Sequence, residues 1–180
     1  MATPASTGIG DKKPKMKEIA LGGELDSKLG YAKEKLGQTV SINEVFAEGN
    51  LVDLHGITKG KGFQGTTKRY GTPLKHHKAE KGQRGVGNLG AWTPKRVQFQ
   101  VPMPGKMGFH TRTEYNKLVL KLSGNTEEIN PKAGFKQYGV VKNNYLLIKG
   151  SVVGSRNRAV LLSTAQRPVK QSLPRIKEII

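Results

Sequence analysis

The sequence predicts a mainly β protein: an antiparallel β-barrel with one helix and a long, basic, extended loop. Three observations indicate this fold class. Short segments alternate apolar and polar residues at the period of a strand, one segment has the period of a helix, and residues 59–95 contain almost no aliphatic side chains. With 180 residues, the chain is long enough to bury a core as one domain.

The clearest helical segment is predicted at about residues 24–36. Apolar residues recur there at spacings of four, three and four: Leu25, Leu29, Ala32 and Leu36. Gly37 follows as a natural stop. A further helical turn is expected after Ser41, because Glu44 stands three residues later, as in a capping box.

Strand character follows this helical region. LVDLHGIT at residues 51–58, RVQFQVP at 96–102 and KLVLKL at 117–122 mix apolar and polar residues at short period. YGVVKNNYLLIKGSVVG, residues 138–154, is expected to form a hairpin that turns at Asn143 and Asn144. RNRAVLLS, residues 156–163, is the candidate strand to pair with that hairpin.

These elements divide the chain into four predicted parts. A basic flexible tail is expected at 1–23, which lacks the apolar region of a signal peptide. The barrel is expected at 24–58 and 96–168, the extended loop at 59–95, and a C-terminal extension at 169–180. No segment has the unbroken apolar run of a membrane span.

The charge of the chain indicates a polyanionic partner. Lys and Arg number 31 against 13 Asp and Glu, a formal charge of +18. From Thr58 to Lys121 there are 14 Lys and Arg and two acidic residues, Glu80 and Glu114. A solvated basic surface is the alternative interpretation. Glycines and aromatic residues mixed through the basic run favour nucleic acid.

Three glycines in the basic run have the spacing of a dinucleotide-binding turn: Gly60, Gly62 and Gly65. A strand is expected before them, but no helix is expected after Gly65, because the next residues lack an apolar period and soon reach Pro73. The first acidic residue is Glu80, and no kinase motif follows. These glycines are therefore predicted to serve another phosphate.

Other chemistry is not indicated. The chain has no cysteine, which excludes disulfides and thiolate ligands. His76 and His77 could hold a metal, but adjacent histidines usually point apart and no carboxylate or cysteine supports them. Asp53 and Glu80 form no evident acid–base pair, and no G-x-S-x-G elbow occurs. We therefore expect no enzyme, no metal and no cofactor.

Residues 59–95 cannot fold alone, since ordering them would bury too little apolar surface. They could fold against RNA. Glycines let backbone amides approach phosphates, Lys and Arg neutralise them, and Phe63, Tyr70 and Trp92 can stack on bases. Trp92 stands between Gly90 and Pro94 and is predicted in a turn. A core tryptophan is the alternative.

Four stretches together resemble one family: GITKGKGFQGTTKRYG, HKAEKGQRGVGNLGAWTPKRV, MPGKMGFHTRTEYNKLVLKL and INPKAGFKQYGVVKNNYLLIKGSVVGSRNR. They are similar to the universal large-subunit ribosomal protein L-three, in its archaeal and eukaryotic form, from about Glu24 to Pro168. The resemblance implies a Greek-key barrel on the subunit surface and a loop that threads the large-subunit rRNA toward the peptidyl transferase centre. Trp92 matches the tip of that loop. The rRNA, not the protein, would be the catalyst.

The resemblance implies large-subunit rRNA and neighbouring large-subunit ribosomal proteins as partners, in the cytoplasmic ribosome. The candidate rRNA-binding residues are Lys59, Lys61, Phe63, Lys68, Arg69, Lys75, His76, His77, Lys78, Arg84, Trp92, Lys95, Arg96, His110, Arg112 and Lys117. The alternative function is a free-standing RNA chaperone or ribosome-assembly factor with the same barrel.

The sequence departs from this family in two ways. Family members of this branch have a further segment before the helix that is roughly as long as this chain and includes the first barrel strands. The barrel is therefore expected to be incomplete here. Either a separate chain supplies those strands, or the sequence is a fragment or a shortened variant. Glu80 is acidic where a strongly basic loop is expected.

Overall fold

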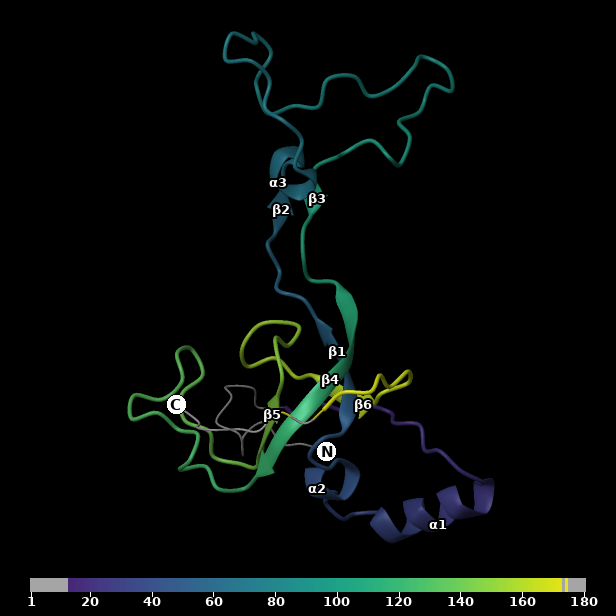
Figure 1. Ribbon diagram of the computed structural model, residues 1–180. Helices are drawn as coiled ribbons and strands as arrows, with labels where there is room; N and C mark the ends of the chain where they lie inside the picture. Colours follow the sequence, from purple (N-terminus) through teal and green to yellow (C-terminus); the bar gives the residue numbers. More distant parts are fainter. Residues whose placement is uncertain (1–12, 173, 175–180) are drawn as a thin grey trace. The chain divides into compact units, whose positions relative to one another are not determined.

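The computed structural model describes residues 13–172 and residue 174, and it divides the chain into two compact units (Figure 1). The sheet unit comprises Met1–Gly56 and Thr113–Ile180, and the loop unit comprises Ile57–Arg112. Most of the predicted C-terminal extension and residues 1–12 of the predicted tail lie outside the described residues. None of the helices in the described part is long and apolar enough to cross a membrane.

Two helices begin the sheet unit. Helix α1, Leu25–Lys35, confirms the predicted segment, but none of its residues is buried, and Leu25 is 71% exposed. Helix α2, Ile42–Val45, begins after Ser41. The Glu44 carboxylate accepts hydrogen bonds from the Ser41 backbone N–H at 3.0 Å and from its hydroxyl at 3.1 Å, which confirms the predicted capping box.

Four strands of the sheet unit form one sheet in the order β5-β4-β1-β6 (Figure 1). They are β1 Leu51–Ile57, β4 Thr111–Ser123, β5 Tyr145–Ile148 and β6 Leu161–Thr164. Strand β6 pairs antiparallel with β1, and β5 pairs antiparallel with β4 across an irregularity between Val119 and Lys121. The mainly β, antiparallel prediction is confirmed. Within the described residues the sheet is open and no closed barrel forms, so the Greek-key barrel stays a prediction.

The core of the sheet unit lies on β1 and β4. Val52, Leu54 and Val119 are fully buried and pack with Phe46. The buried Asp53 carboxylate accepts two backbone hydrogen bonds, from Asn116 at 2.9 Å and from Gln166 at 3.0 Å. Asp53 thereby joins β1 to β4 and to the segment after β6. This structural role was not predicted from the sequence.

Three strand predictions are wrong. Residues 96–102 form no strand, and Phe99 is 92% exposed, because no neighbouring strand pairs with this segment. The hairpin at Asn143 and Asn144 does not form, since β5 pairs with β4 instead. The segment at 156–163 does not pair with that hairpin; its last residues lie in β6, which pairs with β1.

The loop unit has a short local framework of its own. Strands β2, Phe63–Gln64, and β3, Gly105–Lys106, pair antiparallel, with helix α3, Thr66–Tyr70, directly after β2. The helix predicted to be absent after Gly65 is therefore present, but only five residues long. It ends at Gly71, which adopts the left-handed conformation with φ 70°.

Candidate nucleic-acid interface

Two chain segments form the neck of the loop unit, which we define as residues 58–70 and 103–110. Backbone hydrogen bonds join the segments from Thr58 N–H to His110 O, from Lys61 N–H to Met107 O and from Met107 N–H to Gly62 O, at 2.9–3.0 Å. At Gly108, with φ +72°, an added Cβ would lie 2.0 Å from the Lys59 carbonyl oxygen. Only glycine lets the two segments approach this closely.

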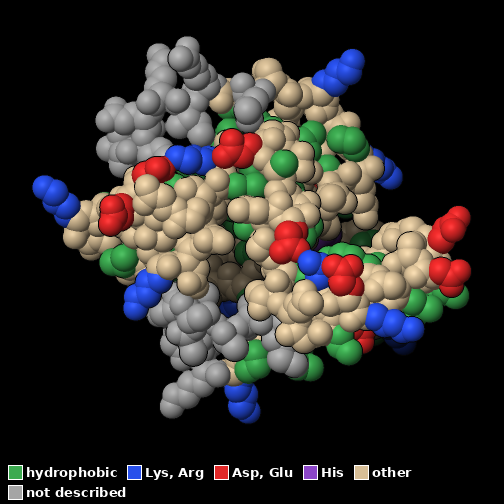
Figure 2. Space-filling view, turned by 90° about the horizontal axis from the view of Figure 1, so that it is seen from below, with side chains coloured by type: hydrophobic (Ala, Val, Ile, Leu, Met, Phe, Trp, Pro, Cys, Tyr) green, Lys and Arg blue, Asp and Glu red, His purple; other side chains and the backbone are tan. Residues whose placement is uncertain are grey.

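The loop unit concentrates positive charge without neutralising it. Between Ile57 and Arg112 there are 12 Lys and Arg and one acidic residue, Glu80. No ion pair joins these charges anywhere in residues 57–112, all of which the structure describes. The sheet unit contains the other 12 acidic residues, and Figure 2 shows acidic and basic side chains interspersed on one face of the molecule.

Most of the predicted contact residues are exposed. Those of the loop unit with exposed side chains are Lys59, Lys61, Phe63, Lys68, Lys75, His76, His77, Lys78, Arg84, Trp92, Lys95, Arg96 and Arg112. Arg69 and His110 are half-buried in the neck. Lys117 belongs instead to the sheet-unit part of β4, where its ammonium is 3.0 Å from a Glu114 carboxylate oxygen.

The predicted tip residue, Trp92, is 82% exposed, which excludes the core alternative. The Lys95 ammonium lies 5.6 Å from its ring centroid, and the Lys95 N–H donates to the Trp92 carbonyl at 2.7 Å. A hollow is lined by Leu89, Gly90, Ala91, Trp92, Lys95, Arg96 and Val97. Apolar side chains beside two cations are suited to a base and its phosphate.

The two adjacent histidines do not point apart, contrary to the expectation from the sequence. Their ring centroids are 4.1 Å apart with the planes tilted by 40°. The His76 Nδ1 atom accepts a hydrogen bond from the Lys78 N–H at 3.2 Å, and the His77 carbonyl accepts one from the Gln83 side chain at 3.0 Å. The rings are therefore part of a local turn. In the described part of the chain, no group of three metal-ligating side chains gathers around them.

One cation of the neck was not among the predicted contact residues. Lys106 in β3 is exposed, and its ammonium lies 5.8 Å from the Phe109 ring centroid. The ammonium also donates to the Phe109 carbonyl at 3.4 Å. The signal for it was present, because Lys106 belongs to the basic run from Thr58 to Lys121.

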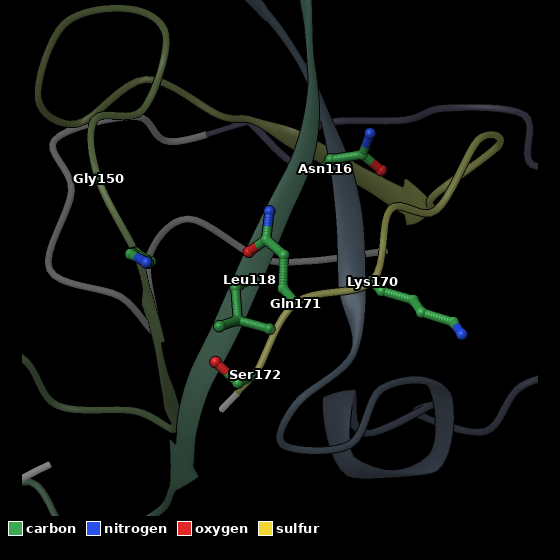
Figure 3. A pocket seen from close by; sticks show the side chains of 7 residues that line it. Asn116, Leu118, Gly150, Lys170, Gln171 and Ser172 are labelled. Carbon is green, nitrogen blue, oxygen red and sulfur yellow. The ribbon is translucent and has the colours of Figure 1, made fainter. Parts of the chain in front are cut away.

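The sheet unit has a separate hollow, lined by Asn116, Leu118, Lys149, Gly150, Lys170, Gln171 and Ser172 (Figure 3). In this view the Gln171 and Ser172 side chains lie beside that of Leu118, whereas the Lys170 side chain points away from it. The two lysines that line it match the basic character of the chain, but no motif in the sequence marked this hollow.

Comparison with known proteins covers both units. The family model described as Ribosomal protein L3 matches residues 3–179. The chain belongs to the ribosomal protein L3 family. It is 50% identical over 179 residues to the large ribosomal subunit protein uL3 of Methanocaldococcus jannaschii, covering 98% of this chain and 53% of that protein. The uL3 protein of Methanocorpusculum labreanum is 46% identical, over 93% of this chain and 51% of that protein.

The chain therefore spans about half the length of the curated L3 relatives it matches. The match includes the whole loop unit, so the neck and the exposed tryptophan lie within the region of similarity. The predicted family is confirmed.

Proposed function

We propose that this chain is a structural, non-enzymatic constituent of the large ribosomal subunit that binds large-subunit rRNA and supports subunit assembly and translation. The observation that carries the proposal is the charge of the loop unit, 12 Lys and Arg against one Glu with no ion pair among them. Such a surface repels itself until a polyanion neutralises it. The relatives are named as proteins of the large ribosomal subunit, which supports rRNA as that polyanion.

The loop would enter the rRNA and reach toward the peptidyl transferase centre. In support, residues 71–101 carry no strand or helix, and their side chains are almost all exposed. An exposed indole beside Lys95 and Arg96 can stack on an unpaired base while the cations contact its phosphates. The rRNA, not the protein, would catalyse the reaction at that centre. Trp92 would support the part of the centre that accepts aminoacyl-tRNA.

Protein partners are expected at the sheet unit. Strands β5 and β6 are the outer strands of the described sheet, so each leaves an edge open to another strand. Helix α1 and the residue after it expose Leu25, Leu29 and Leu36. We propose that the half of the L3 protein this chain does not cover, in the same polypeptide or a second one, completes the barrel there. Neighbouring large-subunit proteins, in the cytoplasmic ribosome, would contact the remaining surface.

The salt dependence of binding tests the proposal. Replacing Lys59, Lys61 and Lys68 with Ala should flatten the slope of log K against log salt by about one unit for each phosphate that is no longer neutralised. The probe is protein-free archaeal large-subunit rRNA. The matched control replaces three exposed lysines of the sheet unit, Lys33, Lys132 and Lys136, and removes the same charge. Equal slopes for the two triple variants would contradict the assignment of binding to the loop unit.

Sedimentation separates this function from a free-standing RNA chaperone or assembly factor. A constituent of the subunit should stay with the large subunit through a high-salt wash, because rRNA would surround its loop. Release of the chain by the wash, with the subunit intact, would support the factor instead.

A further inference from the structure

A long-range side-chain contact from Arg69 of helix α3 joins the two segments of the neck. The Arg69 guanidinium Nη1 donates to the Met103 carbonyl oxygen at 2.7 Å, across 34 residues of sequence. The Arg69 backbone N–H donates to the Gly65 carbonyl at 3.0 Å, which seats the residue in the helix that follows β2. Arg69 therefore connects the two neck segments, 58–70 and 103–110, at the point where the exposed residues 71–101 begin.

Gly105 provides the space for this contact. A Cβ at that position would lie 3.0, 3.2 and 3.4 Å from the Nη1, Cζ and Nη2 atoms of Arg69, so the guanidinium lies against the backbone of β3. Gly105 is itself paired with Gln64 of β2. The Cζ atom is also 5.0 Å from the ring centroid of Tyr70. The planar group thus has contacts on Gly105, Met103 and Tyr70.

The adjacent Lys68 provides a contrast. It is on the same helix and carries the same charge, but its side chain is exposed, whereas that of Arg69 is half-buried. A planar guanidinium can donate a hydrogen bond to a carbonyl and at the same time lie flat against a backbone, whereas an ammonium cannot. The two neighbouring cations are therefore placed for different tasks.

We propose that Arg69 is a positioning residue, which locks the neck through Met103 and Gly105 and so aligns Lys59, Lys61, Lys68 and Lys106 for rRNA, and is not itself a phosphate ligand. The proposal rests on the rRNA-binding function proposed above for the loop unit. It changes the part assigned to Arg69, which the sequence pattern placed among the contact residues.

The lock is tested first in the free protein, without RNA. Arg69→Ala removes the guanidinium. Gly105→Val keeps every charge but fills the space that the guanidinium occupies. Both should raise amide exchange at Lys61 and Met107 about tenfold, as expected when one hydrogen bond to a charged group is removed. Gly105→Ala should have a smaller effect, because the guanidinium need shift only slightly. Lys68→Ala is the matched control and should exchange like the wild type.

A double variant tests whether the larger side chain at Gly105 acts through Arg69 or disturbs the neck in another way. If Gly105→Val acts by displacing the guanidinium, adding this substitution to Arg69→Ala should change exchange little further. Fully additive effects of the two substitutions would overturn the lock, as would wild-type exchange in both single variants.

Binding to protein-free archaeal large-subunit rRNA then tests positioning. Gly105→Val should weaken binding roughly three- to tenfold, because the aligned neck becomes a minor conformer of the free protein. Lys68→Ala should instead lower the salt slope by about one unit. If Gly105→Val binds like the wild type while Arg69→Ala lowers the slope by one unit, Arg69 is a phosphate ligand and the proposal is wrong. Faster exchange with unchanged RNA affinity in Gly105→Val would also overturn it.

Failure of the rRNA-binding function would look different. In that case neither the wild type nor Lys68→Ala would show a salt-dependent affinity for the rRNA, whatever the exchange rates of the neck. The exchange experiment would still report whether Arg69 locks the neck.

Discussion

The sheet unit and the loop unit are stabilised by different means. The sheet unit contains the apolar core, with Val52, Leu54 and Val119 fully buried, and it contains the ion pairs Lys35–Glu44, Lys117–Glu114 and Lys121–Glu128. The loop unit, described throughout, buries only Thr66 and has no ion pair. Backbone hydrogen bonds, Gly108 and the Arg69 side chain maintain its neck instead.

Under the proposed function, this difference separates folding from RNA binding. Apolar burial stabilises a structure before any partner arrives, whereas a run of unpaired cations gains its stabilising partner only on binding. In this chain the two requirements are met in different segments. Substitutions in the sheet unit should therefore act on stability, and those in the exposed loop on RNA affinity.

The largest expected difference is in amide exchange of the free protein. Amides of β1 and β4 around the core should exchange only by global unfolding, whereas residues 71–101 should show almost no protection. The neck should lie between these limits, because it has a hydrogen-bonded ladder and little apolar burial. Strong protection across residues 71–101 without RNA would contradict this order.

The next effect compares two large apolar side chains. Leu54→Ala should lower the free energy of unfolding by about 2–5 kcal/mol, because the side chain is fully buried. Trp92→Ala should change it by less than about 0.5 kcal/mol, since the ring is exposed. Thermal melting measures both.

Binding should show the reverse order. Trp92→Ala should weaken rRNA affinity by about 1–3 kcal/mol if the indole stacks on a base, and ribosomes carrying it should accept aminoacyl-tRNA less well. A melting temperature that collapses in Trp92→Ala while tRNA binding stays normal would reverse the roles assigned to the two units.

Two glycines of the neck give a smaller, local effect. Gly62 and Gly108 have positive φ values of 69° and 72°, but only at Gly108 would a Cβ clash, with the Lys59 carbonyl. Gly62→Ala should therefore cost only the backbone strain, about 1–2 kcal/mol. Gly108→Ala should cost more and open the ladder, seen as faster exchange at Phe109. Equal exchange in the two variants would mean that the close approach at Gly108 does not stabilise the neck.

The smallest effect concerns an ion pair of the sheet unit. Hydrogen bonds from the Ser41 backbone, from Lys35 and from the Ser41 hydroxyl lower the pKa of Glu44 from 4.5 to about 2. The capping contribution should thus be complete above pH 4.5 and disappear as the pH falls toward 2. An NMR titration of the carboxyl measures the midpoint, and Glu44→Gln should remove this pH dependence. A midpoint near 4.5 would show that the capping contacts do not persist in solution.

Local patterns in the sequence were enough to predict several elements. Helix α1, the capping box at Ser41 and Glu44, the strand at 51–57 and the cationic, glycine-rich loop each depend on residues close together in the chain. Periodicity and capping chemistry are local properties, so they can be read without knowing the fold. The exposure of Trp92 also agrees with its predicted place in a turn between Gly90 and Pro94.

The tertiary structure decided which segments meet. The alternation at 96–102 showed that one face of a strand could be apolar. A strand also needs a neighbouring strand to accept its hydrogen bonds. Among the described residues, no strand pairs with residues 96–102. The partner of β6 is β1, with Leu54 opposite Leu162, and the Arg69 guanidinium lies against Gly105. Such pairings join residues far apart in the chain and are chosen by the packing of the whole unit, so no local pattern specifies them.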